Sequence, residues 1–145
     1  IILLADLCDV ERFGRRLSSE ERQFLGTVWP GKVSVILPAF PNQFSYLHRG
    51  VGSLAFRVPS SPVLRGMLRV SGPVIAPSAN PEGLKPAETI AEAEVYFGGL
   101  ADFFVDAGSM KGSPSTLVRF DGKEVEVLRR GETRILEQPF MDRLT

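Results

Sequence analysis

Arginines and small polar side chains recur in four short stretches of this sequence, near the ends of segments expected to be β-strands. They are Arg57 in "LAFRVP", Ser78 and Asn80 in "APSAN", Ser113, Ser115 and Thr116 in "GSPST", and Arg129 and Arg130 in "VLRRG". A guanidinium binds phosphate and carboxylate oxygens through paired N–H donors, and small hydroxyls add further donors. Together these side chains predict a site for a polyphosphate and a carboxylate, although each alone is more simply explained as a turn residue or a solvated charge.

The stretch "APSANPEG" at residues 76–83 supports two interpretations. Ser, Asn, Pro and Gly all favour turns. A strand-to-helix connection also places backbone N–H groups and short polar side chains where an anion can reach them. The octapeptide alone favours a turn. The presence of further candidate ligand-binding residues elsewhere in the sequence, Arg57, Ser115 and Arg129, favours ligand contact by Ser78 and Asn80.

Familiar catalytic motifs are missing from the sequence. It has no Walker phosphate loop, no G-x-G-x-x-G, no Cys/His metal spacing and no G-x-S-x-G. The single histidine, His48, lies in "YLHRGVG" with no acid nearby to orient it, so we expect a surface loop there rather than a general base. No metal site and no individual catalytic residue is assigned.

Strand and helix patterns alternate along the chain. Asp9 is expected to cap a first helix, Ser18 and Glu21 have capping-box spacing for a second, and Ser61 begins a third that ends at Gly72. The expected helices cover 9–17, 18–29, 61–72 and 87–97, with a helical tail over 133–144 broken at Pro139. The expected strands lie within 1–4 and over 32–37, 53–59, 73–77 and 101–108, with an exposed loop over 38–52 and, over 116–131, a hairpin with a primed turn at Asp121-Gly122.

This alternation predicts an α/β (α+β) fold with a twisted mixed sheet flanked by helices, as a single domain over residues 1–145. Lys plus Arg and Asp plus Glu number 17 each, so the net charge is zero and the sequence lacks the basic field of a dedicated nucleic-acid binder. Cys8 is expected to be a buried thiol, which favours a reducing, cytoplasmic location. The opening apolar run is too short to span a membrane, and because it begins at Ile1 we expect upstream sequence to be missing.

Five segments, in this order and at this spacing, resemble the YrdC-like family of threonylcarbamoyl-AMP synthases: "WPGKVSVILP", "SLAFRVP", "GPVIAPSAN", "VDAG" with "GSPSTLV", and "VLRRGE". The resemblance extends to about Glu132 and implies a domain with a cleft at strand ends. It implies a nucleotidyltransferase that makes threonylcarbamoyl-adenylate and pyrophosphate from L-threonine, bicarbonate and ATP, for the t6A modification of tRNA. ATP is a substrate here, and Mg²⁺ is expected to arrive with it.

The resemblance also implies roles for individual residues. The ATP contacts would be Ser53, Asn80, Thr89 and Arg129, and the threonine contacts would be Arg57, Ser78 and Ser115. Three departures from the family pattern stand out: Pro114 replaces a usual glutamate, Arg130 replaces a usual proline, and the family's N-terminal threonine and lysine-arginine motifs have no counterpart.

Two other functions remain open. The same fold could hold RNA through Lys32, Arg57, Lys85, Lys111 and Arg129, without catalysis, or hold a nucleotide alone. It could also be a carbamoyl-adenylate-forming domain of the hydrogenase-maturation type. The expected partners are the small-molecule substrates, with tRNA or tRNA-modification proteins as further candidates and no membrane.

Overall fold

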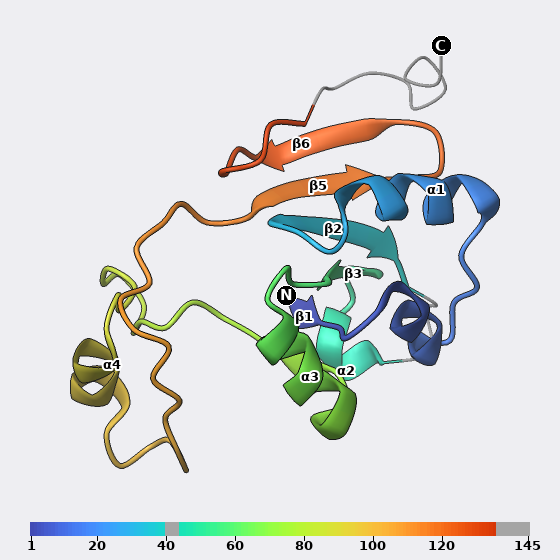
Figure 1. Cartoon of the computed structure of the whole chain (residues 1–145). Helices are drawn as coiled ribbons and strands as arrows, with labels where there is room; N and C mark the ends of the chain where they lie inside the picture. The colour runs from blue at the N-terminus through green and yellow to red at the C-terminus, as the bar shows by residue number, and fades with distance from the viewer. Residues whose placement is uncertain (40–43, 136–145) are drawn as a thin grey trace. The chain divides into compact units, whose positions relative to one another are not determined.

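The computed structural model describes residues 1–39 and 44–135 of the chain. The chain divides into two compact units, which we call the sheet unit (Ile1–Ala76 with Pro114–Thr145) and the small unit (Pro77–Ser113). Figure 1 shows the strands in the first and helix α4 in the second, and each unit is described by itself. Most of the tail predicted to be helical lies outside the described residues, and the single domain stays a prediction.

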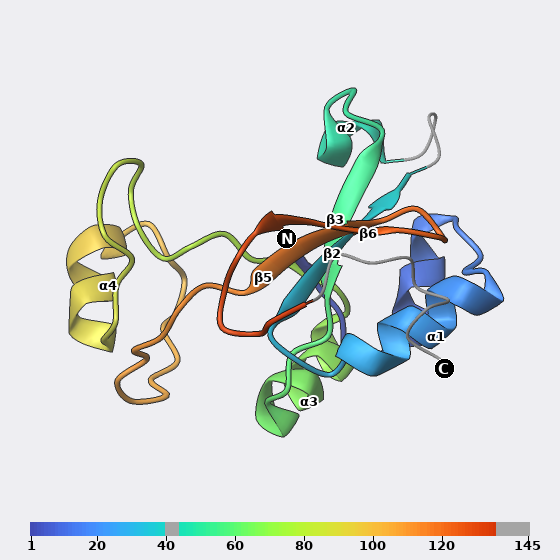
Figure 2. The same ribbon diagram turned by 90° about the horizontal axis from the view of Figure 1, so that it is seen from above.

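A mixed six-stranded sheet forms the sheet unit, in the order β4-β1-β3-β2-β5-β6. The strands are β1 (Ile2–Leu3), β2 (Val33–Pro38), β3 (Ser53–Arg57), β4 (Val74–Ile75), β5 (Thr116–Phe120) and β6 (Val125–Arg129). The pairs β1/β3 and β2/β5 are parallel, and the other three are antiparallel. Seen from above, β5 and β6 cross β2 and β3 at an angle, which is the sheet's twist (Figure 2). The predicted twisted mixed sheet is confirmed.

Successive strand residues point to opposite sides of the sheet, and the residues that point to one of these sides are apolar. Helices η1 (Leu7–Phe13, a 3-10 helix) and α1 (Ser19–Val28) pack on this side. The ring centroids of Phe13 and Phe56 lie 5.1 Å apart, and those of Phe24 and Phe120 lie 4.4 Å apart. The buried strand residues include Val33, Val35, Leu37, Leu54, Phe56, Val118 and Phe120.

Helix ends follow the capping chemistry of the sequence, with one correction. Ser18 and Glu21 form the predicted capping box of α1. Helix α3 (Pro62–Ser71) starts after Ser61 and ends at Gly72, as predicted. Asp9 was the wrong cap for the first helix: Asp6 is the N-cap, and the carboxylate of Asp9 accepts from the Asp6 backbone N–H at 3.1 Å.

Two burial predictions are wrong. Cys8 is exposed, because η1 turns Val10 toward the core and Cys8 outward. His48 is 6% exposed and ends a short helix, α2 (Ser45–His48), inside the segment predicted to be an exposed loop. Its Nδ1 accepts hydrogen bonds from the N–H groups of Gly50 (3.2 Å) and Gly52 (3.3 Å). The imidazole therefore stabilises the turn that follows α2.

The β5–β6 hairpin is confirmed, but its turn differs from the prediction. Phe120 pairs with Val125, which leaves the four residues 121–124 in the loop instead of a two-residue primed turn. Oδ1 of Asp121 accepts from the N–H groups of Lys123 and Glu124, both at 2.9 Å. This side-chain acceptor replaces the tight backbone turn that Asp-Gly suggested.

The small unit contains α4 (Ile90–Phe97), which Thr89 caps. No residue of 77–113 is buried, and backbone bonds such as Met110 N–H to Glu88 C=O at 2.7 Å hold the unit's segments together. The strand predicted over 101–108 is wrong: within the part of the chain that the structure describes, this segment pairs with no strand, and Phe103 is 74% exposed. Among the described residues no helix is long and apolar enough to cross a membrane.

Candidate functional site

The strand directions gather several of the predicted site residues at one end of the sheet. Strands β3 and β6 finish there with Arg57 and Arg129, whereas β2 and β5 begin there, next to Lys32 and Ser115. These residues come from positions 32 to 129 of the sequence, so only the sheet order makes them neighbours (Figure 1).

The same side chains also share one face of the sheet. Ser34 pairs with Leu117, and Leu117 pairs with Arg129, so all three point to one side. Ser115 lies two residues before Leu117 and therefore points the same way. This is the face opposite the core formed with η1 and α1.

Ser115 is the centre of a hydrogen-bonded cluster. Its hydroxyl lies 2.9 Å from the hydroxyl of Ser34, and both residues are buried. Arg129 donates to the Ser115 carbonyl from Nη2 at 2.9 Å and from Nε at 3.3 Å, and Nη2 also reaches the Ser115 hydroxyl at 3.3 Å. The predicted threonine contact and the predicted phosphate contact are therefore in direct contact with each other. Sequence reasoning missed Ser34, whose only signal was a hydroxyl inside an otherwise apolar strand.

Thr116, the partner of Ser115 in the serine-threonine pair, has a structural role. Its hydroxyl donates to the Thr133 carbonyl at 2.5 Å and accepts from the Gly131 N–H at 3.1 Å. These bonds tie the start of β5 to the segment that follows β6, so they fix the end of the strand that carries Arg129.

Arg57 lies at the same end and is half-buried. Its Nε donates to the Gly31 carbonyl at 2.8 Å, and Gly31 in turn donates to the Val58 carbonyl at 2.9 Å. Burial lowers the pKa of Arg57, and the nearby carboxylate of Glu132 acts in the opposite direction. Glu132 also forms an ion pair with Lys32. The single negative charge of Glu132 does not balance the three positive charges of Lys32, Arg57 and Arg129, so this end of the sheet carries an excess of positive charge.

Ser53 is not brought to this cluster. It begins β3, opposite Pro38, whereas Arg57 ends the same strand. Four residue steps along a strand cover about 13 Å, so Ser53 lies at the other end of the sheet.

The "APSAN" loop belongs to the small unit, where Ser78 is exposed. Nδ2 of Asn80 donates to the carbonyls of Pro81 and Leu84, both at 2.9 Å. The Asn80 amide thus holds the turn that the first interpretation predicted. Its Oδ1 is buried and has no hydrogen-bond partner among the described residues, which leaves one acceptor for a ligand donor.

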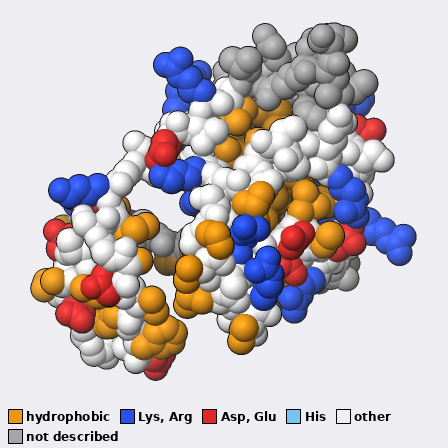
Figure 3. All heavy atoms as spheres, viewed as in Figure 1, with side chains coloured by type: hydrophobic (Ala, Val, Ile, Leu, Met, Phe, Trp, Pro, Cys, Tyr) orange, Lys and Arg blue, Asp and Glu red, His pale blue; other side chains and the backbone are white. Residues whose placement is uncertain are grey.

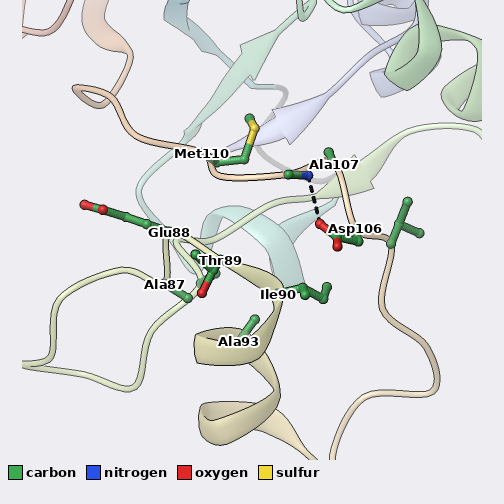
Figure 4. Close-up of a pocket in the computed structure, with 11 residues that line it drawn as sticks. Ala87, Glu88, Thr89, Ile90, Ala93, Asp106, Ala107 and Met110 are labelled. Carbon is green, nitrogen blue, oxygen red and sulfur yellow. Dashed lines mark hydrogen bonds between the residues drawn. The ribbon is translucent and has the colours of Figure 1, made fainter.

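A pocket of about 210 Å³ lies beside this loop, wholly within the small unit. Figure 4 shows Thr89, Ile90 and Ala93 on one wall, facing the segment that carries Asp106 and Met110. The Thr89 hydroxyl accepts from the Glu92 N–H at 3.3 Å as the cap of α4, which leaves its proton and one acceptor lone pair for a ligand. Asp106 holds its own turn through the Gly108 N–H at 2.8 Å.

Charge is mixed over the surface. Basic and acidic side chains are interspersed on the face shown in Figure 3. Of the residues named for the RNA alternative, Lys32 pairs with Glu132 and Lys85 with Glu88. Within 1–39 and 44–135, no group of three or more His, Cys, Asp or Glu side chains could hold a metal ion.

Comparison with known proteins gives a consistent result. Residues 1–131 match the family model named Sua5/YciO/YrdC and described as telomere recombination. Threonylcarbamoyl-AMP synthase of Cellvibrio japonicus is 37% identical over 103 residues, which cover 70% of this chain and 54% of that protein. The protein of the same name from Halorhodospira halophila is 30% identical over 131 residues, which cover 90% and 68%. The chain thus spans between about half and two thirds of these two relatives.

The fold is also that of a solved structure. P. abyssi Sua5 complexed with L-threonine superposes with a TM-score of 0.79 at 23% identity, over 90% of this chain and 39% of that one. At that identity the likeness concerns the fold.

Proposed function

The chain belongs to the Sua5/YciO/YrdC family, and we propose that it makes threonylcarbamoyl-AMP and pyrophosphate from L-threonine, bicarbonate and ATP, as a nucleotidyltransferase. One observation carries the proposal: Arg129, expected to bind phosphate, donates hydrogen bonds to Ser115, expected to bind threonine. The reaction requires the two substrates to meet, and these residues lie together. The names of the relatives from Cellvibrio japonicus and Halorhodospira halophila support the same activity.

The chemistry suits this arrangement. The threonine amine adds to bicarbonate with loss of water, and an oxygen of the resulting carbamate attacks the α-phosphate of ATP as pyrophosphate leaves. Negative charge builds on the phosphate oxygens in that step, so cations and donors that are already in place lower its barrier. Arg129 is held against Ser115 by its Nε and Nη2, and Arg57 is fixed by Gly31, so neither guanidinium needs to be ordered when substrate arrives.

The remaining roles follow the family pattern. Arg57, Ser78 and Ser115 contact threonine, and Asn80, Thr89 and Arg129 contact ATP. The family pattern also gives Ser53 an ATP contact; because Ser53 lies about 13 Å from Arg57 along β3, that contact would involve a different part of ATP from the one that Arg129 binds. The buried Oδ1 of Asn80, which has no hydrogen-bond partner among the described residues, and the pocket of the small unit support the ATP contacts of Asn80 and Thr89. Mg²⁺ arrives with the triphosphate, and the product passes to tRNA through other proteins of the t6A pathway in the cytoplasm.

The test uses the full chain with ¹⁴C-bicarbonate, L-threonine and ATP. We expect a labelled adenylate that requires both threonine and ATP, and we expect Arg129→Ala to abolish it. Arg119→Ala is the matched control, because Arg119 is an exposed strand arginine paired with Glu126, away from Ser115. Absence of labelled adenylate together with absence of ATP binding by calorimetry contradicts the proposal. RNA binding that weakens steeply with salt, without ATP binding, favours the RNA alternative instead.

A further inference from the structure

Ser34 is a polar side chain in an apolar position. It lies on β2 between Val33 and Val35, and its exposed fraction is 0%. Its hydroxyl makes one hydrogen bond among the described residues, to the hydroxyl of Ser115 at 2.9 Å. A buried hydroxyl costs free energy unless it is hydrogen-bonded, so this contact is what makes Ser34 tolerable in the sheet.

The surroundings fix the direction of that bond. If Ser115 donated to Ser34, the Ser34 proton would be buried without an acceptor among the described residues. If Ser34 donates instead, the proton of the fully buried hydroxyl is satisfied and the Ser115 proton is the one left unpaired. Ser115 is 7% exposed, so its own proton has a route to solvent or to a ligand. The second arrangement is therefore the stable one.

The Ser115 hydroxyl then has its acceptor capacity filled. An oxygen of this kind accepts two hydrogen bonds and donates one. Ser34 supplies the first donor, and Nη2 of Arg129 supplies the second at 3.3 Å. What remains is the single Ser115 proton, held in one direction by two fixed neighbours.

We propose that Ser34 is a positioning residue: it orients the Ser115 hydroxyl so that its proton is donated to an oxygen of the bound amino-acid substrate. This inference rests on the proposed function, because the substrate is L-threonine. Ser34 itself does not touch the substrate. Its hydroxyl acts through Ser115, and the strand register that pairs Ser34 with Leu117 keeps the two hydroxyls in reach.

The experiment measures L-threonine affinity of the full chain by calorimetry. Ser34→Ala is expected to weaken binding roughly three- to tenfold, the range of one neutral hydrogen bond. Ser34→Thr keeps the hydroxyl and should bind like the parent protein. Ser34→Cys keeps the branching of the side chain but replaces the hydroxyl with a thiol, which is a weak donor, so it should lose affinity.

Coupling between the two serines separates positioning from a general loss of stability. In a Ser115→Ala background, Ser34→Ala is expected to cause no further loss of affinity. Thr27→Ala is the control, because it removes a hydroxyl that donates to the Phe24 carbonyl in α1 and should leave affinity unchanged.

The outcomes are distinct. If the parent protein binds L-threonine and either Ser34→Cys binds as well as Ser34→Thr or the two alanine substitutions are additive, the positioning role is refuted while the proposed function stands. If the parent protein fails to bind L-threonine, the proposed function and the inference built on it both fall.

Discussion

Gly131 allows the segment after β6 to pass directly against the start of β5. A Cβ added at this glycine would lie 2.2 Å from the Pro114 carbonyl oxygen, 2.5 Å from the Thr116 nitrogen and 2.6 Å from the Ser115 carbonyl carbon. All three atoms belong to the backbone, so no flexible side chain can move aside. The backbone conformation at Gly131 is one that L-residues adopt, so the cost of Gly131→Ala is steric.

The size of the effect follows from these contacts. The segments must separate by about 0.8 Å to restore the 3.0 Å that real Cβ atoms require. Overpacking of this kind costs about 1 to 3 kcal/mol, and the Gly131 N–H bond to Thr116 at 3.1 Å is weakened as well. We expect a total loss of roughly 2 to 3 kcal/mol, which lowers the Tm by roughly 6 to 10 °C.

The measurement is urea denaturation of the parent chain and the Gly131→Ala variant. Gly66→Ala is the matched control, because Gly66 lies inside α3 and an added Cβ meets nothing within 4 Å. That change should raise stability by about 0.5 to 1 kcal/mol, since alanine is the better helix former. Equal stability of Gly131→Ala and the parent would falsify the close approach of the two segments.

Two further predictions concern the charged side chains. Arg129→Lys should lower L-threonine affinity about tenfold, because a lysine ammonium cannot donate to Ser115 from two nitrogens as Nε and Nη2 do, whereas Arg119→Lys should bind like the parent in the same titration. The N–H groups of Glu124 and Lys123 hold the pKa of Asp121 below its ordinary value of 3.8, so its contribution to stability is present above that pH and disappears as the pH falls through the lowered pKa. Asp121→Asn keeps an acceptor oxygen for both bonds but does not titrate, and its unfolding free energy should therefore fall less between pH 5 and pH 2 than that of the parent; parallel acid profiles would contradict this.

Local chemistry made most of the elements predictable. The Ser18–Glu21 capping box, the Ser61–Pro62 start of α3 and the alternating runs around Asp121 depend on neighbours within a few residues. Those features act in the same way whatever the rest of the chain does.

The errors share a physical origin in contacts that local patterns do not contain. The apolar run near Phe103 has the composition of a strand, yet a strand needs a neighbour to pair with. Cys8 is apolar in character, but the turn of η1 decides which of its residues face the core. The Pro- and Gly-rich surroundings of His48 predict a surface loop, although two backbone N–H groups donate to its imidazole and hold it inside.

The candidate site, like the fold, has features that the sequence predicts and features that depend on tertiary contacts. The residue types of Arg57, Ser115 and Arg129 were sufficient to predict anion binding, because guanidinium and hydroxyl groups suit phosphate and carboxylate wherever they lie. The sequence could not place Ser34 beside Ser115, since they are 81 positions apart and meet only through the β2/β5 register. The sequence also could not show that Ser53 lies at the opposite end of the sheet from Arg57, Ser115 and Arg129.

By itself, the sequence determined the chemical groups available, the helix caps and the alternation that makes a mixed sheet. Only the tertiary structure decided which end and which face of that sheet each group occupies, because strand order and register are set by long-range pairing and core packing. For this protein, that pairing turns a buried serine on β2 into a neighbour of Ser115 and Arg129.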